Sequence, residues 1–540
     1  SNRVLLHTAR TTTSIYLHNG KFTYFGICNQ LNPLLQRESC SKVIDLDFNF
    51  DGLPLFKSNS IGVWPILCRS LSIESLHKPL IVGLFTGKGK PEPIHIYLEN
   101  FIQELNNILH YGIKVDSKLF QVKIRSIICD APARAFLKCC VSHNSRYGYE
   151  KCNVEGEYIN HRMSFPCTKG ELQTKDMFNE QIYEEHHKGV SPLLNLDLDL
   201  ENQVPLDPMH LVYLGVMKQL LTIWVSKGKP PFKLPAKSIN DLSDKLLSMS
   251  SCIPREFSRK CRSLLELNRW KATEFRLFLL YVDPVSLRSI LPKRLHDHFL
   301  MFHVGITILN SDDHISKYID FAEEVINNFV KYIKDSYGKE VITYNIHSLI
   351  HLVADVRNLG NLNIISCFPF ENYLGKLKTL VRSPIKPHEQ LCRRIHEISD
   401  FSKINLPITE LEPRQKHSEG PVLNRGIRFI LQYRKLKTQT YVLSISSPDN
   451  YVTIRGNIII ELLNILRLQD QSYCLIGRRF QSVSEFYNYP CSSKLLNIFK
   501  VSDISSCIEE FPFISVICKN VLLPGHEKGT YIVYPLLHEL

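Results

Sequence analysis

The spacing of apolar residues changes twice along this chain, and that order of patterns restricts the fold more than any other feature. Residues 22–130 have strand-like apolar runs around one helical pattern at 94–109, residues 208–358 are helical throughout, and residues 420–540 contain short strands separated by turn signals. Strands followed by a helix and another strand indicate a mixed sheet with helices packed on it. The sequence therefore predicts an α/β region, an all-helical region and a C-terminal β domain.

Length, charge and cysteine usage restrict the class of protein. A chain of 540 residues predicts two or three domains, and 44% hydrophobic with 22% charged residues is typical of a folded protein. The net charge of +12 favours a polyanionic partner without identifying it. The 16 cysteines are scattered, which indicates reduced thiols rather than a disulfide framework.

Targeting signals are missing from the printed sequence. It has no signal-peptide pattern at its start and no apolar run long enough to span a membrane, so we expect a soluble, intracellular protein without a membrane partner. The chain begins with Ser in the middle of a pattern, so we also expect a missing upstream region.

Acidic residues alternate with apolar ones at the first well-defined strand. In residues 43–51, Asp45, Asp47 and Asp51 share one face. One interpretation is the solvated face of an edge strand, and the other is that an acid binds a metal ion. Asp51 ends the strand, directly before Gly52, and is the stronger candidate, with Asp47 as the alternative if the register is shifted.

A second acid stands in an equivalent position. Asp130 closes the apolar run 122–129 and precedes Pro132, where a short helix is expected to begin. Acids at the carboxyl ends of buried strands lie where α/β folds place their ligand groups. The alternative is that Asp130 serves only as a helix N-cap.

Five longer motifs carry a resemblance to a known family. They are DGLPLFKSNSIGVWPIL, CDAPARAFLKCCVSHNSRYGYEKC, SPLLNL with VPLDPMHLVYLGVMKQLL, WKATEFRLFLLYV and FPFENYLGKLKTLVRSP. Together, from about residue 20 to 400, they resemble CACTA-like (En/Spm-type) transposases of animal genomes. The terminal β domain is similar to a tail on such proteins.

The resemblance implies an α/β ribonuclease H-like core with a large all-helical insertion, plus a small C-terminal β domain. It also implies an Asp-Asp-Glu triad made by Asp51, Asp130 and Glu371, holding two Mg²⁺ or Mn²⁺ ions. The implied activity is metal-dependent DNA cleavage and strand transfer in the nucleus, with transposon ends and target DNA as partners and with self-association. For Glu371 the alternative is that its charge only complements a helix N-terminus.

The same resemblance sets the expected domain boundaries. Residues 1–40 form a lead-in, 41–139 and 360–400 the catalytic core, 140–359 the insertion, and 420–540 the β domain.

A second metal-like pattern of the family is incomplete in this chain. Tyr149 stands where the first cysteine of a Cys-x-x-Cys pair is expected, leaving Cys152, while Asp207 and His210 keep the Asp-x-x-His pattern. Zinc needs four ligands, so Cys152, Asp207, His210 and His143 form a degenerate candidate zinc site, with Cys139 or Cys140 as substitutes. Otherwise Asp207 caps the helix beginning near Met209 and His210 bonds back toward Cys152.

Basic residues follow the third acid, and DNA approaching the triad would meet them. They are Lys376, Lys378, Arg382, Lys386, Arg393 and Arg394. A solvated helix face is the alternative. The rival function is a domesticated or decayed transposase-derived protein that binds DNA or chromatin without cutting it, and Tyr149 and the missing upstream region favour that rival.

Overall fold

The structure is a computed structural model that describes residues 13–36, 42–56, 60–73, 76–228, 232–402, 411–423 and 429–538. Its chain divides into two compact units, Ser1–Leu211 with Gly338–Leu406, and Val212–Tyr337 with Pro407–Leu540. Each unit is therefore assembled from two separate stretches of sequence.

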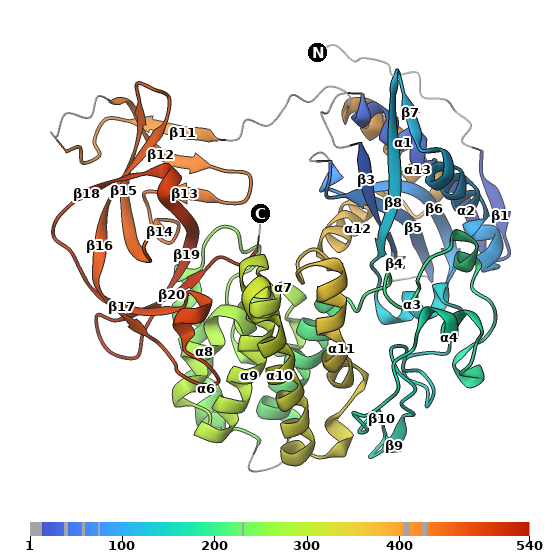
Figure 1. Ribbon diagram of the computed structural model, residues 1–540, viewed down its shortest axis with the longest axis horizontal. Helices are drawn as coiled ribbons and strands as arrows, with labels where there is room; N and C mark the ends of the chain where they lie inside the picture. Colours follow the sequence, from blue (N-terminus) through green and yellow to red (C-terminus); the bar gives the residue numbers. More distant parts are fainter. Residues whose placement is uncertain are drawn as a thin grey trace. The chain divides into compact units, whose positions relative to one another are not determined.

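The first unit contains a mixed sheet with its covering helices (Figure 1). Its strands are β1 (Ile15–Leu17), β2 (Gly20–Tyr24), β3 (Val43–Phe50), β4 (Leu53–Pro54), β5 (Ile61–Ser70), β6 (Leu80–Lys88), β7 (Ile113–Val115) and β8 (Lys118–Ile127), with a separate hairpin of β9 (Glu157–Ile159) and β10 (Arg162–Ser164). Its helices are α1 (Ile27–Leu35), α2 (Ile94–Tyr111), α3 (Ala131–Leu137), α4 (Lys175–Asn179), α11 (Tyr344–Leu359), α12 (Phe368–Leu380) and α13 (Pro387–Ser402).

The order of strands in this sheet is β1-β2-β6-β5-β3-β8-β7, with β4 paired to β5. All neighbours are antiparallel except β3 and β8, which run parallel. A parallel pair needs a crossover connection, and α2 supplies it. Strand β3 is thus central in the sheet, with β5 on one side and β8 on the other.

The two faces of the sheet are covered by different helices. Phe48 and Phe50 of β3 contact the ring of Phe101 in α2 edge to face, at centroid distances of 5.0 and 5.5 Å. On the other face, Thr23 of β2 bonds to the His388 ring of α13 at 2.8 Å. Successive residues of a strand point to opposite faces, so the acidic side of β3 faces away from α2.

The second unit combines helices with an antiparallel sheet. Its helices include α5 (Lys218–Thr222), α6 (Ala236–Met249), α7 (Ala272–Leu277), α8 (Asp283–Ser286), α9 (Lys293–Leu309) and α10 (Asp312–Tyr337). Helix α10 ends at Tyr337, because the next residue, Gly338, has a φ of 98° that continues no helix. Helix α9 is buried on nearly every side and α10 packs along it.

The C-terminal sheet has ten strands, and all of their pairings are antiparallel. Its strands are β11 (Glu412–His417), β12 (Phe429–Lys437), β13 (Val442–Ser444), β14 (Tyr451–Ile454), β15 (Ile458–Leu468), β16 (Tyr473–Glu485), β17 (Phe499–Ile504), β18 (Glu509–Pro512), β19 (Val516–Pro524) and β20 (Tyr531–Pro535).

A buried ion network joins this sheet to the helical part of the second unit. The Lys519 ammonium on β19 is fully buried and donates to Glu256 at 2.8 and 2.9 Å and to Asp449 at 2.6 Å. Arg255 donates to the same Asp449 carboxylate at 2.9 Å. The charges of Lys519 and Arg255 match those of Glu256 and Asp449, and the network links the sheet to the helical part of its unit.

The predicted order of a mixed sheet with a parallel pair, a helical middle region and a C-terminal antiparallel β domain is confirmed. The domain boundaries stay a prediction: β1 and β2, from the expected lead-in, extend the first sheet, and residues 140–211 belong to its unit. Of the helices that the structure describes, none has the length and apolar character needed to cross a membrane.

Candidate active site

The carboxyl ends of β3 and β8 bring two of the predicted acids to one edge of the sheet. The backbone N–H of Ile128 donates to Phe48 at 2.8 Å, and that of Phe50 donates to the Cys129 thiol at 3.3 Å. The chain therefore continues side by side just past the two parallel strands. Asp51 and Asp130 are the next residues, at the position where α/β sheets present ligand groups.

A tight turn fixes Asp51. Its carboxylate accepts a hydrogen bond from the backbone N–H of Gly52 at 2.6 Å, and the residue is only 8% exposed. A side chain at Gly52 would put its Cβ 2.6 Å from the Trp64 ring of β5. The glycine is needed for this close approach, which turns the chain immediately after the acid.

Asp130 is held at the start of helix α3. One of its carboxylate oxygens accepts a hydrogen bond from the backbone N–H of Ala133 at 2.7 Å, which is an N-cap. The predicted cap is confirmed. The cap uses one oxygen of a partly exposed side chain, so it is compatible with a second role for Asp130.

Helix α12 delivers Glu371 to the same place. Glu371 lies in the first turn of α12, and its backbone N–H donates to Cys367 at 2.9 Å. Lys378, farther along the helix, donates to the Pro54 carbonyl at 2.8 Å and so anchors α12 beside β4. The Glu371 side chain shares a hydrogen bond with Asp51.

The electrostatics of this acid group are unfavourable without a counter-ion. Burial raises the pKa of Asp51 well above its usual range, and the negative charges of Asp130 and Glu371 raise it further. Within the described ranges of the chain, no ion pair joins any of the three acids to a lysine or arginine. The Lys90 ammonium, which feels the charge of Asp130, donates to the Pro132 carbonyl at 2.8 Å instead.

Asp51 is the common member of the group. It interacts with both Asp130 and Glu371, while the described residues contain no set of these three whose oxygens all lie within 4.8 Å of one another. One ion touching all three would need such a set. Two ions about 3.5–4 Å apart would not need such a set, because Asp51 could bind both ions while Asp130 and Glu371 each bind one. An all-oxygen donor set of this kind suits Mg²⁺ or Mn²⁺.

His210 is the cationic group beside these acids. Its Nδ1 bonds to the Asp207 carboxylate at 2.6 Å. Burial lowers its pKa, but the hydrogen bond and charge of Asp207, together with the charges of Asp130 and Asp51, outweigh burial and raise the pKa to about 9. The imidazole is therefore positively charged at neutral pH.

Asp207 acts as a structural clamp. Its two oxygens accept from the backbone N–H groups of Met209, His210 and Cys367 at 3.1, 3.0 and 2.8 Å, besides the His210 ring. A carboxylate has about four acceptor sites, so Asp207 has none left for a metal ion. The predicted cap at Met209 is confirmed, and Asp207 also fixes the start of α12, the helix that carries Glu371.

The four residues of the degenerate zinc site do not come together. His210 bonds to Asp207 rather than toward Cys152, so that expectation is wrong. The Cys152 thiol instead lies 3.5 Å from the His347 ring, and the His143 ring contacts Tyr344 at a centroid distance of 5.4 Å. Two separate metal-like groups result, Asp207 with His210 and Cys367, and Cys152 with His347 and His351.

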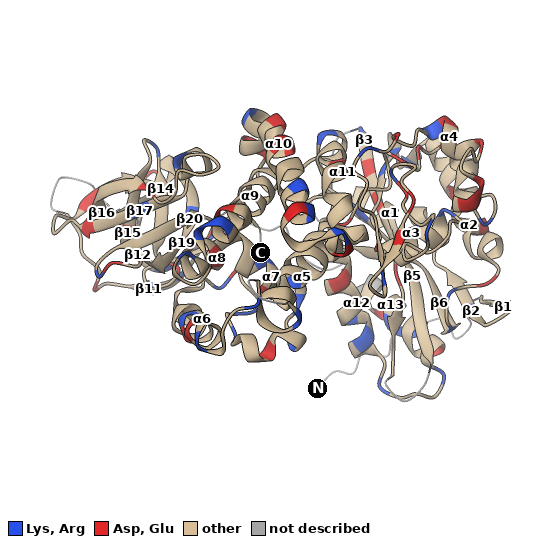
Figure 2. Ribbon diagram, turned by 90° about the horizontal axis from the view of Figure 1, so that it is seen from below, with Lys and Arg blue, Asp and Glu red and all other residues tan. Residues whose placement is uncertain are grey.

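The predicted basic residues differ in how free their charges are. Lys376, Arg382 and Lys386 are exposed around the end of α12, and Figure 2 shows basic as well as acidic segments on this helix. Arg393 and Arg394, on α13, both donate to Glu397, at 3.0 and 2.7 Å. Only the first group, with Lys378, is well placed to meet a phosphate backbone.

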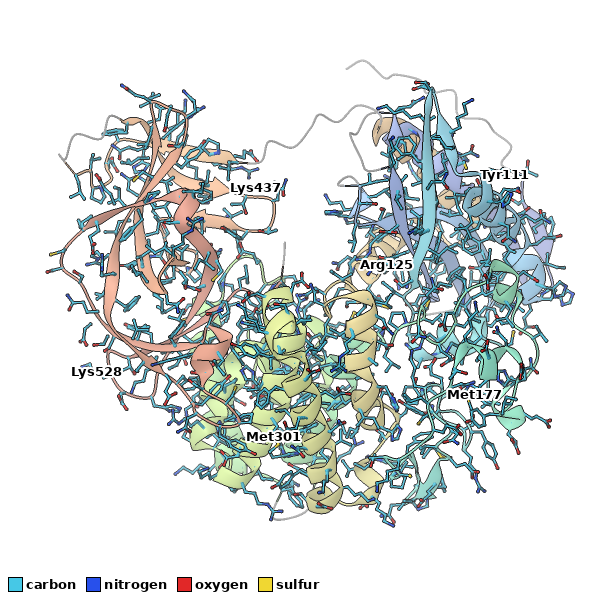
Figure 3. The ribbon with its side chains drawn as sticks, viewed as in Figure 1. Tyr111, Arg125, Met177, Met301, Lys437 and Lys528 are labelled. Carbon is cyan, nitrogen blue, oxygen red and sulfur yellow. The ribbon has the colours of Figure 1, made fainter. Side chains whose placement is uncertain are left out.

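The acidic face of β3 is not the solvated edge that one interpretation expected. Asp47 is 1% exposed and lies between Arg69 of β5 and Arg125 of β8, the residue labelled in Figure 3, at 3.1 and 2.5 Å. Ser126 donates to its other oxygen at 2.6 Å. These bonds satisfy Asp47 completely, so it is not the alternative metal ligand.

Sequence reasoning missed two features of the candidate sites. The position of His210 beside Asp51 follows from the fold alone, and no local pattern signals it. His347 and His351, by contrast, lie four residues apart in a segment correctly predicted as helical, and this spacing places both rings on one face. That spacing was a usable signal.

The C-terminal part of the chain matches a protein-family model. Residues 416–536, which form most of the C-terminal sheet, match a domain of unknown function, DUF8592. No curated protein matches the chain.

Proposed function

We propose that this protein is a DDE-type transposase-like enzyme that cleaves and joins DNA, with Asp51, Asp130 and Glu371 as its metal-binding acids. One observation carries the proposal: three carboxylates from three separate elements meet without a lysine or arginine partner among the residues that the structure describes. A fold keeps such an arrangement at a cost in stability, which is typical of sites built for a cation.

The topology supports a ribonuclease H-like core. The neighbouring strands β6-β5-β3 are antiparallel, and β8 then joins β3 in parallel through helix α2. Two acids follow the parallel pair, and the third comes from a helix more than 200 residues farther along the chain. This is the arrangement that the resemblance to CACTA-like transposases implies.

Asp51, Asp130 and Glu371 would hold two Mg²⁺ or Mn²⁺ ions. Bound there, the ions would supply Lewis acidity at a phosphodiester, activating water for cleavage and later the 3′ hydroxyl for joining. The residues around the acids would contact the DNA. His210, cationic and held through Nδ1 by Asp207, has Nε2 available to donate to a phosphate oxygen. The exposed basic side chains on α12 and just after it would position the DNA backbone.

Nicking of supercoiled plasmid DNA in Mn²⁺ tests the proposal. Asp130→Asn should reduce the nicking rate at least about 100-fold, because it removes one ligand charge while the cap to Ala133 can persist. Asp197→Asn is the matched control, since that carboxylate is exposed and pairs only with Lys175. Equal nicking by wild type and Asp130→Asn contradicts the assignment.

The rival function is DNA binding without cleavage. It is supported by the exposed basic side chains alone, because binding through them needs no metal ion. It predicts that wild type and Asp130→Asn bind duplex DNA equally and that neither nicks it in Mg²⁺ or Mn²⁺. The same pair of proteins therefore separates the two functions.

A further inference from the structure

The turn between β6 and α2 lies at the same edge of the first sheet as the acid group. Strand β5 is antiparallel to both β3 and β6, so β6 runs parallel to β3. Because the carboxyl ends of parallel strands lie at one edge, β6 ends at Lys88 on the edge where β3 leads to Asp51. Residues 87–90 of this turn read Gly-Lys-Gly-Lys. The turn therefore brings two basic side chains to the acidic edge.

Asn19, in the connection between β1 and β2, holds this turn in place. Its side-chain amide donates to the carbonyl of Lys88 at 2.6 Å and also to the carbonyl of Lys90. The backbone carbonyl of Asn19 accepts from the N–H of Lys88 at 3.0 Å, and its side-chain oxygen accepts from the N–H of Glu92 at 3.3 Å. The backbone that carries Lys90 is therefore fixed on both sides of this residue.

Two aromatic rings and one carbonyl group hold the Lys90 ammonium. Its Nζ lies 5.7 Å from the centre of the Trp64 ring and 5.1 Å from that of Phe136, which pack edge to face at a centroid distance of 5.6 Å. The ammonium also donates to the Pro132 carbonyl at 2.8 Å. Cation–π contacts of this kind attract a lysine charge and restrict its position.

The same contacts place Lys90 beside the two aspartates of the acid group. Helix α3, which it contacts, has Asp130 as its N-cap, and Lys90 feels the charge of that carboxylate. The Trp64 ring is the one that leaves no room for a side chain at Gly52, directly after Asp51. The ammonium therefore lies next to the acid group, on the side of Asp130.

The Lys90 ammonium keeps hydrogen-bond donors for a ligand. An ammonium has three N–H donors, and among the residues that the structure describes only the Pro132 carbonyl accepts from this one. A second lysine faces the same region. Burial lowers the pKa of Lys90, the charge of Asp130 opposes that shift, and the charge of the exposed Lys188 adds to it. Two neighbouring ammonium groups favour an anionic ligand.

We propose that Lys90 binds a backbone phosphate of the DNA, next to the phosphodiester that the acid group would cleave. The inference rests on the proposed function, because it places the DNA at Asp51, Asp130 and Glu371. It adds a contact on the Asp130 side, whereas the basic side chains of α12 belong to the helix that carries Glu371. Lysine suits this task, because its point charge binds phosphate whatever the base sequence.

The alternative is that Lys90 only fastens helix α3 to the β6–α2 turn through the Pro132 carbonyl. Lys90→Met distinguishes the two roles, because methionine can keep the packing on Trp64 and Phe136 but carries no charge. A purely structural role predicts a lower urea midpoint with an unchanged salt dependence of DNA binding. A phosphate contact predicts a changed salt dependence.

Fluorescence anisotropy of the full chain with a short duplex tests the inference, with Ca²⁺ in place of Mg²⁺ or Mn²⁺ so that binding is measured apart from nicking. Lys90→Met should weaken binding about 3- to 10-fold and lower the slope of log affinity against log salt by about 1. The loss should be equal for two duplexes of unrelated sequence, because both offer the same phosphates. Lys90→Arg should keep the wild-type slope, because it keeps the charge.

Lys118→Met is the matched control. Lys118 is exposed and begins β8, so it lies at the opposite edge of the sheet from Asp130 and should leave the slope unchanged. Wild-type affinity and slope in Lys90→Met overturn the inference, even where the wild type nicks DNA. A reduced slope supports the contact, and absence of nicking by the wild type would then contradict the proposed cleavage alone.

Discussion

Two buried carboxylates, one in β3 and one directly after it, lie on the same face four residues apart, and their surroundings are opposite. Asp47 in the middle of the strand is held by Arg69, Arg125 and Ser126. Asp51 just past its end has two other acids as its main electrostatic neighbours. The difference distinguishes a charge that the fold has neutralised from one with no lysine or arginine partner among the described residues, which residue type and burial alone do not reveal.

The second unit also contains buried carboxylates whose charge is neutralised by basic side chains, as that of Asp47 is. Glu256 and Asp449 share the fully buried Lys519, and Arg255 adds to the Asp449 side. Replacing one partner of such a network leaves an uncompensated buried charge. Paired carboxylates should therefore respond to mutation through stability, and the acid group should respond through metal binding.

The largest expected effect compares Asp47 of β3 with Asp51 directly after it. Asp47→Asn should destabilise the protein by about 3–5 kcal/mol, because the buried Arg69 loses its counter-charge. Asp51→Asn should instead stabilise the metal-free protein by about 1 kcal/mol at pH 7, because it removes a carboxyl whose pKa is raised. Urea unfolding with chelator present, with hydrogen exchange of β3, measures both. The same sign for both variants would refute the distinction.

Metal ions should have the next largest effect. Mn²⁺ at about 100 times its dissociation constant should stabilise the wild-type first unit by about 2.7 kcal/mol. The stabilisation should vanish in Asp51→Asn, which removes the acid common to both ions, and should persist in Asp197→Asn. Hydrogen exchange of β3 and α12 with and without Mn²⁺ provides the measurement. Equal protection of wild type and Asp51→Asn would rule out Asp51 as a ligand.

Asp283 in the second unit provides a further comparison. Among the described residues its carboxylate has no hydrogen-bond partner, and burial, without any acidic neighbour, is the cause of its raised pKa. It is fully buried, and burial raises its pKa well above the ordinary 3.8. The native state then keeps a proton that the unfolded state releases, so stability falls as the pH rises above about 3.8 toward the raised value. Asp283→Asn should therefore stabilise by about 1–2 kcal/mol at pH 7.

The pH dependence provides the check on Asp283. The gain in urea midpoint for Asp283→Asn over wild type should shrink between pH 7 and pH 4, because the wild-type carboxyl is protonated in both states at low pH. Unlike the acid group, Asp283 should show no response to Mn²⁺. A gain independent of pH would mean that ionisation of Asp283 is not its cause.

The smallest effects concern the basic residues. Lys386→Ala should weaken duplex DNA binding a few-fold and reduce the slope of log affinity against log salt by about 1, because its exposed charge is available to a phosphate. Arg393→Ala should change the slope less, since Glu397 already holds that guanidinium. Fluorescence anisotropy across a salt series measures both. A larger slope change for Arg393→Ala than for Lys386→Ala would mean that Arg393, not Lys386, contacts the phosphate backbone.

Local patterns predicted the elements well. The alternation in 43–51 became β3, the spacing from Ile94 onward became α2, and Asp130 and Asp207 are the caps that their positions suggested. Each of these features depends on neighbours a few residues away. The expected zinc ligands failed for the opposite reason, since the neighbour of the Cys152 thiol is His347, from a distant segment.

The sequence by itself determined where the strands and helices form and which acids stand at their ends, because strand periodicity and capping are local properties. Only the tertiary structure decided which carboxylates are neutralised. The register of β5 and β8 against β3 decides that Arg69 and Arg125 reach Asp47, while no arginine of the described residues pairs with Asp51. Charge compensation acts through space over a few ångströms, so the packing of distant segments sets it.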